Sequence, residues 1–596
     1  MATPLTSNTS PQQQYEARLA HWRTVLQAED KRYGQFSDFR MWTVIAGLGL
    51  AWWDLPYAGI AAAVFFVLMV MHSRIDERRI AARRGIAYFE RGLARLQGKW
   101  AGSGPTGDRF LDSNHVFAAD LDLFGRGSLF QLISTARTAA GEDVLASWLL
   151  HPASRDDVKD RQTAVRELAP QVDLRETTAL TGDDIHANWR LSPVEPFPTW
   201  AIPTSWTITA ASLTAAIGWI AGLWTSAPLL SVALIALLVT WVLRRQILDG
   251  MSALDSSSRE LDLLVRLLHH LEERNVQSPL LQRLRSTVSG SSKQVAYLKK
   301  LVTLSDAGRN QYLMPVMIPL LWNVHVANAM YRWQQTHAAD VDAWMRALAE
   351  FEALCSLSCY AFENPTHAYP ELVAEPVFDA TELGHPLLAA DHCVRNNVDF
   401  GGPTRLVIVS GSNMSGKSTM LRSIGLNVVL AWAGCSVRAT SLKLGRFAVG
   451  ASLRTADSIQ DGKSRFYAEI TRLKQITDLT TGPIPVLFLL DELLSGTNSH
   501  DRRIGAQGIL KALVDRGAIG LVTTHDLALA SIADVAEGTI RNVHFEDHVE
   551  GGEIRFDYKM RPGVVTRSNA LELMRAVGLL PAAPTSPARP HLADPE

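Results

Sequence analysis

The chain has 596 residues, enough for roughly two to four domains and a sizeable hydrophobic core. Its 58 lysines and arginines nearly balance its 60 aspartates and glutamates, which argues against a basic nucleic-acid coat protein or an acidic disordered tail. Four cysteines exclude a disulfide scaffold and are typical of a reducing compartment. Only 20% of the residues are charged and 47% are hydrophobic, so the chain carries an apolar excess.

The apolar excess lies in two stretches. Residues 41–71 contain one charge, Asp54, and residues 200–243 contain none. Each stretch is longer than the roughly 20 residues of one membrane span and has a turn signal near its middle. Eight of the 16 tryptophans fall in them, as expected for aromatic residues at a membrane surface. The pattern predicts transmembrane helical hairpins at 41–72 and 200–245, four spans in all. Two pairs of buried core helices are the alternative.

The charges beside these stretches predict their orientation. Arg40 and Arg74 flank the first one, Arg244 and Arg245 follow the second, and neither turn carries a lysine or arginine. By the positive-inside rule, both termini and all large segments are cytoplasmic. We therefore expect a multi-pass protein of a bacterial-type inner (plasma) membrane, with the bilayer as a partner.

The remaining segments differ in composition and hydrophobic pattern. Residues 1–40 form a polar N-terminal segment, and helical patterns fill 73–199 and 246–380, including a leucine stripe from Leu261 to Leu271. Between 381 and 580, apolar β-branched runs at 406–410, 486–490 and 520–524 alternate with helical stretches, which predicts a parallel α/β sheet. The Pro- and Ala-rich residues 581–596 predict a disordered tail.

A phosphate-binding pattern follows the first of these strands. Residues 411–418 read GSNMSGKS, between the strand 406–410 and a helix predicted from Thr419. In such a loop, glycines let backbone N–H groups wrap phosphates at a helix N-terminus, while the lysine reaches the β- and γ-phosphates and the last serine binds Mg²⁺. The predicted nucleotide contacts are Gly411, Ser412, Asn413, Met414, Ser415, Gly416, Lys417, Ser418 and Thr419.

Two further strand ends complete the predicted chemistry. Asp491 and Glu492 follow the strand 486–490, where a metal-binding aspartate and a water-activating glutamate are needed. Asp491 is expected to share Mg²⁺ with Ser418, and Glu492 to act as general base. His525, after the strand 520–524, is placed to sense the γ-phosphate. The sequence thus predicts an ATPase that uses ATP and Mg²⁺, with Lys417, Glu492 and His525 as catalytic residues.

These motifs resemble the ATPase domain of the MutS DNA mismatch-repair family. The run GSNMSGKSTMLRSIGLNVVLAWAGCSVRA from Gly411 carries the similarity, and Asn413-Met414 inside the loop is characteristic of that family. The resemblance continues through DGKSRF at 461–466, where it makes Ser464 the residue that reaches the nucleotide of a partner subunit. It therefore implies composite sites at a homodimer interface. The expected fold is an α/β P-loop NTPase domain of the ABC/MutS type, attached to an all-α domain like the MutS core, with two transmembrane hairpins.

The chain also departs from the family pattern. Segments between 123 and 152, and Phe351-Glu352-Ala353-Leu354, resemble the family's helical core. However, the place of the mismatch-reading domain holds a polar segment and the first apolar stretch, without the Phe-x-Glu motif. The residue that stacks on adenine aligns loosely with Cys393-Val394, neither of which is aromatic.

Three functions are compatible with these features. The first is a membrane-anchored, MutS-like ATPase whose nucleotide cycle drives a conformational change. The second is a membrane-tethered protein that binds mismatched or branched DNA, with Lys293, Lys299 and Lys300 as a candidate basic face. The third, an ABC-class transporter, fits less well because Leu494-Ser495-Gly496 follows the acidic pair instead of preceding it.

Overall fold

The computed structural model describes residues 10–53, 55–180, 195–252, 258–308, 313–412, 414–453, 465–494, 497–525, 530, 538–550 and 553–565. These residues form two compact units, a helical unit and a sheet unit. The helical unit comprises Met1–Lys99, Ile133–Ser147 and Thr163–Glu363, and the sheet unit comprises Trp100–Leu132, Trp148–Gln162 and Asn364–Glu596. The chain crosses between the units several times, so neither unit is one continuous segment.

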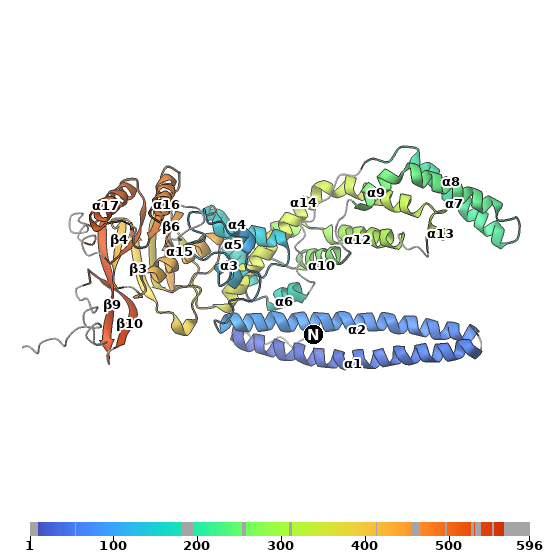
Figure 1. Ribbon diagram of the computed structural model, residues 1–596, viewed down its shortest axis with the longest axis horizontal. Coiled ribbons are helices and arrows are strands. Elements are labelled where there is room, and N and C mark those ends of the chain that lie inside the picture. Colours follow the sequence, from blue (N-terminus) through green and yellow to red (C-terminus); the bar gives the residue numbers. More distant parts are fainter. Residues whose placement is uncertain are drawn as a thin grey trace, which may run out of the picture. The chain divides into compact units, whose positions relative to one another are not determined.

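The helical unit begins with a long antiparallel hairpin of α1 (Pro11–Trp53) and α2 (Leu55–Leu96) (Figure 1). Two glycines one heptad apart on α2 let aromatic rings of α1 approach closely. A Cβ on Gly85 would lie 2.8 Å from Trp22, and one on Gly92 would lie 2.6 Å from Tyr15. This end of the hairpin is also joined by ion pairs, among them Arg79–Asp30 at 2.7 Å. It is therefore packed like the helices of a water-soluble protein.

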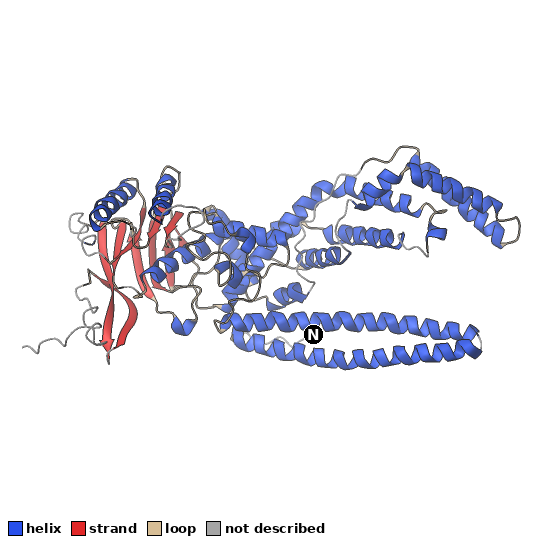
Figure 2. Cartoon of the chain, viewed as in Figure 1, coloured by secondary structure: helices blue, strands red, loops and turns tan. Residues whose placement is uncertain are grey.

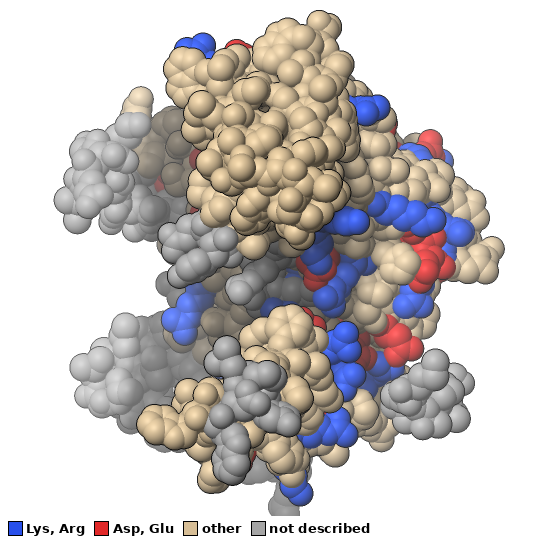
Figure 3. Space-filling view, turned by 90° about the vertical axis from the view of Figure 1, so that its right-hand side faces the viewer, with Lys and Arg blue, Asp and Glu red and all other residues tan. Residues whose placement is uncertain are grey.

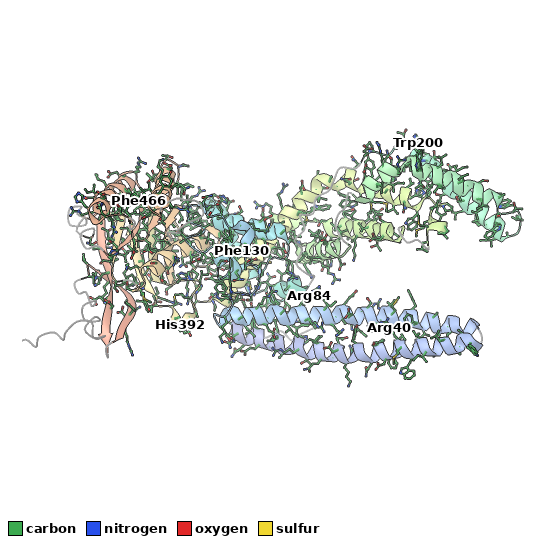
Figure 4. The ribbon with its side chains drawn as sticks, in the orientation of Figure 1. Arg40, Arg84, Phe130, Trp200, His392 and Phe466 are labelled. Atoms are coloured by element: carbon green, nitrogen blue, oxygen red, sulfur yellow. The ribbon has the colours of Figure 1, made fainter. Side chains whose placement is uncertain are left out.

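The other end of this hairpin is apolar and uncovered. Arg40 on α1 marks the change, and Arg84 lies farther back on α2 (Figure 4). Beyond Arg40, large side chains such as Trp42, Leu48 and Phe66 are exposed, and Trp52 is 94% exposed. The helices run well beyond the predicted segment 41–72 in both directions, because the polar flanks 11–40 and 73–96 are helical too.

A second hairpin consists of α7 (Ala201–Ile220) and α8 (Ala227–Val242), and α9 (Arg244–Ser252) follows it. Its outer faces expose Trp206, Ile220, Leu234 and Trp241. Figure 3 shows the surface of this hairpin almost free of charged side chains.

Length and composition support fewer than the four predicted spans. Among the described residues, one helix, Gly59–Leu96, is long and apolar enough to cross a membrane, and only 6% of its most apolar window is buried. A second candidate exists if Ala227–Val242 and Arg244–Met251, which are bent by 66° at their junction, count as one span. The helices α1 and α7 do not qualify, so two complete transmembrane hairpins are not supported.

The rest of the helical unit is built around α14, whose buried side chains line much of its length. The leucine stripe from Leu261 to Leu271 is buried as predicted, on α10. The remaining helices are α3 (Leu129–Ile133), α4 (Ala139–Leu150), α5 (Arg155–Leu168), α6 (Val172–Leu180), α10 (Ser258–Glu273), α11 (Pro279–Thr287), α12 (Ser291–Gly308), α13 (Met314–Met317) and α14 (Trp322–Glu363).

The sheet unit contains a larger sheet of six strands in the order β10-β9-β4-β8-β7-β6 (Figure 2). The strands β9, β4, β8, β7 and β6 run parallel, and β10 is antiparallel to β9. The bounds are β4 (Leu406–Ser410), β6 (Ala448–Ser452), β7 (Val486–Leu490), β8 (Ile519–Thr524), β9 (Ile540–Glu550) and β10 (Glu553–Pro562). The predicted strands 406–410 and 486–490 are confirmed, and the third begins one residue earlier than predicted.

Helices cover this sheet because its central strands are apolar on both faces. Every residue of β4, β7 and β8 is buried. Leu473 of α16 (Arg465–Leu479) and Leu510 of α17 (Ser499–Asp515) share a hydrophobic cluster with Phe488. The helix α15 (Lys417–Ala433) also packs on the sheet, at β7 and β8.

A smaller sheet, in the order β1-β5-β2-β3, accompanies the larger one. Its strands are β1 (Glu371–Leu372), β2 (Val377–Leu383), β3 (Asn396–Gly401) and β5 (Ser441–Leu444). The sheet unit therefore begins earlier than the predicted boundary at residue 381.

The segment 97–128 differs from the helical structure predicted for it. It is made of turns and one short 3₁₀ helix, Asp108–Phe110, and most of it belongs to the sheet unit. Its backbone contacts the large sheet, since the Ala451 N–H donates to the Val116 carbonyl at 2.8 Å. Gly98, Gly102, Gly104, Gly107, Gly125 and Gly127 all have positive φ angles, which a helix does not allow.

Candidate nucleotide site

The three strand ends named in the sequence analysis lie at one edge of the large sheet. The strand β8 pairs with β4 on one side and β7 on the other, and all three are parallel. Ser410 is level with Thr524, and Leu490 is level with Val522. The residues that follow each strand therefore meet at the carboxyl edge, where ligands bind in open α/β sheets.

The loop after β4 has a backbone conformation that depends on its glycines. Gly416 has φ of +106° and precedes the first residue of α15. A Cβ on Gly411 would lie 2.9 Å from Ser415 Oγ and 3.0 Å from the Phe545 carbonyl oxygen. Met414 also has positive φ and its side chain is exposed. The loop thus brings backbone close to the N-terminus of a 17-residue helix, a favourable position for an anion.

Lys417 is the first residue of α15 and is nearly buried. Its Nζ donates to the carbonyl oxygens of Gly411 and Ser412, both at 2.8 Å. Burial lowers the pKa of this ammonium, while the carboxylates of Glu492 and Asp491 act in the opposite direction. The lysine charge is therefore fixed over the loop and faces the acidic pair.

The acidic pair after β7 is held by Thr523 of β8. The fully buried Thr523 hydroxyl donates to Asp491 Oδ1 and accepts the backbone N–H of Glu492 at 3.0 Å. The Asp491 N–H in turn donates to the Ser452 carbonyl of β6 at 2.9 Å. Glu492 has φ of +47°, an uncommon backbone conformation for a non-glycine residue. Both carboxylates therefore have backbones fixed by the neighbouring strands.

His525 lies beside Glu492, as its place at the end of β8 suggested. Its Nδ1 is 3.6 Å from Glu492 Oε1, and the side chain is about half exposed. This distance is a charge contact when the imidazole is protonated and too long for a good hydrogen bond. The histidine can therefore influence the predicted general base directly.

A cavity of about 800 Å³ joins these groups. Lys417, Ser418, Thr419, Asp491 and Glu492 line its phosphate side. The cavity is also lined by residues outside the loop: His392, Cys393, Val394, Asn396, Phe545 and Tyr558. His392 is shown in Figure 4. The volume suits a nucleotide-sized ligand.

Two residues at the site could not be recognised in the sequence. Thr523 reads only as a β-branched strand residue, because nothing in the local pattern shows that its hydroxyl faces Asp491. Tyr558 lies on β10, and its ring stacks on Phe556 at 5.9 Å between centroids. The side chain of Asn396 ties it in place, donating to the Tyr558 carbonyl at 3.0 Å and accepting from the Met560 N–H at 2.8 Å. Cys393 and Val394 line the cavity, although neither offers an aromatic ring to an adenine.

Two predicted site residues, Asn413 and Ser464, lie outside the described residues. Ser495 and Gly496, which the transporter alternative uses, lie outside them too. In the described part of the chain, no group of three or more His, Cys, Asp and Glu side chains could hold a metal ion. Mg²⁺ usually binds proteins through one or two carboxylates together with substrate phosphates and water, so Asp491 and Ser418 remain the residues that fit it.

Among the residues that the structure describes, only two of the three lysines in the candidate DNA-binding face are exposed without an ion pair to a neighbouring helix. Lys293 and Lys300 on α12 are exposed, whereas Lys299 forms an ion pair with Asp262 of α10 at 2.5 Å. Since one of three charges is neutralised within the protein, the triplet is a weak electrostatic surface.

The parallel sheet, the loop at the start of α15 and the acidic pair define an α/β domain with an ATPase fold. Comparison with known sequences agrees: residues 407–593 match the family model for MutS domain V. Residues 407–593 are therefore similar to MutS domain V, and the match lies in the sheet unit.

Three named relatives are similar to part of this chain. The DNA mismatch repair protein MSH3 of Phaeosphaeria nodorum is 34% identical over 237 residues, 38% of this chain and 21% of that protein. The endonuclease MutS2 of Thermus thermophilus is 35% identical over 196 residues, 33% of this chain and 25% of that protein. The DNA mismatch repair protein MutS of Streptococcus uberis is 28% identical over 251 residues, 41% of this chain and 29% of that protein. The chain thus spans less than a third of the length of these relatives.

Proposed function

We propose that this protein is a membrane-anchored ATPase of the MutS type, whose nucleotide cycle changes the conformation of its helical unit. The observation that carries the ATPase proposal is the single cavity that joins Lys417, Ser418, Asp491 and Glu492 at adjoining strand ends. The match of residues 407–593 to MutS domain V supports the same activity. The chain connects the two units directly at this point, because α14 ends at Glu363 and the last segment of the sheet unit begins at Asn364.

Each group on the phosphate side has a proposed role. Lys417 and the N–H groups of the loop bind the β- and γ-phosphates, and Ser418 and Asp491 hold Mg²⁺, which neutralises charge on the transferred phosphoryl group. Glu492 accepts a proton from the attacking water. His525, 3.6 Å from this carboxylate, positions it and responds to the γ-phosphate. The Thr523 hydroxyl keeps Asp491 aimed at the metal.

The cavity residues outside the loop are proposed to hold the nucleoside. Tyr558 offers an aromatic face, while Cys393 and Val394 offer a small apolar surface. Tyr558→Ala should weaken binding of ATP and ADP roughly tenfold, consistent with the loss of one stacking contact on a base. Unchanged affinity in Tyr558→Ala would show that the base binds elsewhere.

The active form is proposed to be a homodimer with composite sites. This proposal is based on the MutS-like run at 461–466, in which Ser464 would reach the partner's nucleotide. Sedimentation of the Glu492→Gln variant should show more dimer with ATP and Mg²⁺ than with ADP. The Ser464→Ala change in that background should remove the difference. A dimer fraction independent of nucleotide would contradict composite sites.

Membrane anchoring is proposed for the apolar ends of both hairpins. It is supported by exposed aromatic and aliphatic side chains, including Trp52 at 94% and Ile220 at 79%. Large uncovered apolar surfaces of this kind mark membrane or partner contacts. The termini and the ATPase domain would lie on the cytoplasmic face of an inner (plasma) membrane. The full-length protein should float with liposomes after high-salt and carbonate washes. Recovery in the soluble fraction after these washes would contradict anchoring.

DNA binding is the second candidate, because relatives of this chain are named as DNA mismatch repair proteins. The protein in lipid discs should be assayed for ATPase rate alone and with homoduplex, mismatched or branched DNA. The MutS-type ATPase proposal predicts Mg²⁺-dependent hydrolysis without DNA. Stimulation by mismatched or branched DNA, with binding that weakens steeply as salt rises, would favour the second candidate. No hydrolysis under any condition would contradict both.

A further inference from the structure

A further charge-free stretch lies outside the two hairpins. Residues 310–331, between Arg309 and Arg332, contain no Asp, Glu, Lys or Arg. The described part starts with the short apolar helix α13 (Met314–Met317), and α14 begins at Trp322. Leu313, Met314 and Val316 are exposed, and Val316 most of all, at 62%. The stretch contains Pro315 and Pro319, which interrupt it, so that it is not one continuous apolar helix.

The backbone is irregular between α13 and α14. Leu321 has φ of +48°, and its N–H donates to the Ile318 carbonyl at 3.0 Å. Proline at 319 supplies no N–H of its own, and the turn leaves the carbonyls of Pro319 and Leu320 outside regular helix bonding. Such carbonyls need partners wherever water cannot reach them.

Side chains of α7 supply these partners. Ser212 Oγ donates to the Pro319 carbonyl at 2.7 Å, and Thr209 Oγ1 donates to the Leu320 carbonyl at 3.0 Å. Thr209 Oγ1 is also 3.0 Å from His325 Nε2. Because the hydroxyl has one hydrogen and gives it to Leu320, the imidazole Nε2–H must donate to Thr209. The break is thus satisfied by protein groups alone.

Apolar contacts fix the same segment on the second hairpin. Leu321 and Val324 are buried in one cluster with Ile208 of α7 and Ala236 of α8. The Trp206 ring lies 4.3 Å from the His325 ring, between centroids. One face of residues 313–325 therefore packs against the α7–α8 hairpin. The side chains of Leu313, Met314 and Val316 are exposed.

We propose that residues 313–325 are a third membrane-embedded element, which lies against α7 in the hydrocarbon layer, with lipid acyl chains in contact with Leu313, Met314 and Val316. This inference rests on the proposed membrane anchoring of the α7–α8 hairpin. Non-helical backbone is tolerated at membrane depth only where protein groups satisfy it, which is what Thr209 and Ser212 do. A water-exposed turn would need no such donors.

Depth-dependent fluorescence quenching tests the proposal. Single cysteines are placed by Val316→Cys, Leu234→Cys on α8 and Tyr297→Cys on α12, each in a Cys393→Ser background, since the other three cysteines are buried. Each is labelled with an environment-sensitive fluorophore, and the full-length protein is placed in lipid discs with brominated acyl chains. The labels at 316 and 234 should be quenched at least severalfold more than the label at 297.

The outcomes separate this inference from the proposal beneath it. Quenching at 234 without quenching at 316 overturns the third element and leaves the anchored hairpin intact. No quenching at either position overturns both the membrane anchor and the third element. Quenching at 297 equal to that at 316 also overturns the inference, because the label would then report only non-specific adsorption to lipid.

A second measurement tests the role of the two hydroxyls. Thr209→Val with Ser212→Ala should speed amide hydrogen exchange in residues 313–325 by roughly tenfold or more in lipid discs, since two part-buried carbonyls lose their donors. Thr207→Val with Thr214→Val is the matched control, because these hydroxyls bond only to carbonyls of their own helix, Pro203 and Ala210. Equal exchange in the two double variants would overturn the proposed capping of the embedded break.

Discussion

Thr523 holds Asp491 by a hydrogen bond from its hydroxyl, which joins the end of β8 to the residue that follows β7. The same hydroxyl accepts the N–H of Glu492, so one buried side chain positions both members of the acidic pair. Second-sphere hydrogen bonds of this type orient metal ligands and set their affinity. Thr523 is accordingly the positioning residue of the site.

The first prediction concerns this threonine. Thr523→Val keeps the shape of the side chain but removes the hydroxyl, so Asp491 should lose its fixed orientation. The Mg²⁺ concentration needed for half-maximal ATPase activity should rise roughly 10- to 100-fold. Thr477→Val is the control, since that hydroxyl bonds only to the Leu473 carbonyl of its own helix. An unchanged Mg²⁺ dependence in Thr523→Val would show that Asp491 does not act on the metal.

The second prediction concerns nucleotide binding. Lys417→Ala removes the ammonium that lies over the loop, and affinity for ATP should fall about 100-fold, the size of lost hydrogen bonds to a charged group. Titration with a fluorescent ATP analogue measures this change. Lys474→Ala should bind normally, because Lys474 lies on the exposed face of α16 in an ion pair with Asp478. Normal affinity in Lys417→Ala would place the phosphates elsewhere.

The third prediction concerns pH and Glu352 of α14. Burial raises the pKa of this carboxyl to about 7, although the Thr138 hydroxyl and the Arg137 N–H act to lower it. The folded state therefore binds a proton that the unfolded state releases above about pH 4.5, and stability should fall as pH rises from about 4.5 to 7. The loss should be roughly 1–3 kcal/mol.

Variants isolate this contribution. Glu352→Gln should flatten the pH dependence of the melting temperature between pH 5 and 8 and melt higher than the wild type at pH 8. Glu350→Gln is the control, because Glu350 is partly exposed. Its nearest oxygen lies 3.9 Å from Arg283, which makes this ion pair a weak one. A wild-type pH profile in Glu352→Gln would mean that another group titrates.

The fourth prediction concerns the buried pair of Arg95 and Glu363. The Arg95 Nη2–Glu363 Oε1 distance is 2.6 Å, and the Tyr15 hydroxyl also donates to Glu363 at 3.1 Å. Arg95→Met leaves a buried carboxylate without its cation, so the helical unit should be destabilised by roughly 3–5 kcal/mol. Chemical denaturation followed by circular dichroism measures this.

Two comparisons sharpen that result. Arg95→Met with Glu363→Gln should recover part of the loss, since no buried charge then remains unpaired. Arg23→Met should cost less than about 1 kcal/mol, because its pair with Glu90 is exposed on both sides. A double variant no more stable than Arg95→Met alone would argue against a charge effect.

Much of the nucleotide site could be predicted from the sequence, because its signals are local. The loop 411–418, the pair Asp491-Glu492 and His525 each follow a short apolar strand, and parallel strands bring such residues to one edge. Thr523 and Tyr558 could not be predicted, since their roles depend on which strands are neighbours and on the path of β10.

The helical unit was harder to predict for a different reason. Apolar composition located the two hairpins but not their length, since the polar segments 11–40 and 73–96 continue the same helices. Helix was predicted for 97–128, but glycines with positive φ angles break the helical conformation there and the segment forms turns. The stretch 310–331 does not read as one apolar helix, because its prolines divide it into short pieces.

The rate of ATP hydrolysis by the Glu492→Gln variant tests the central claim most directly. Full-length wild type and variant are measured in lipid discs with Mg²⁺, alongside binding of a fluorescent ATP analogue. The account predicts that Glu492→Gln binds ATP like the wild type but hydrolyses it at least 100-fold more slowly, as expected when the general base is lost. Turnover at the wild-type rate in Glu492→Gln would contradict the assignment of this cavity as the ATPase site.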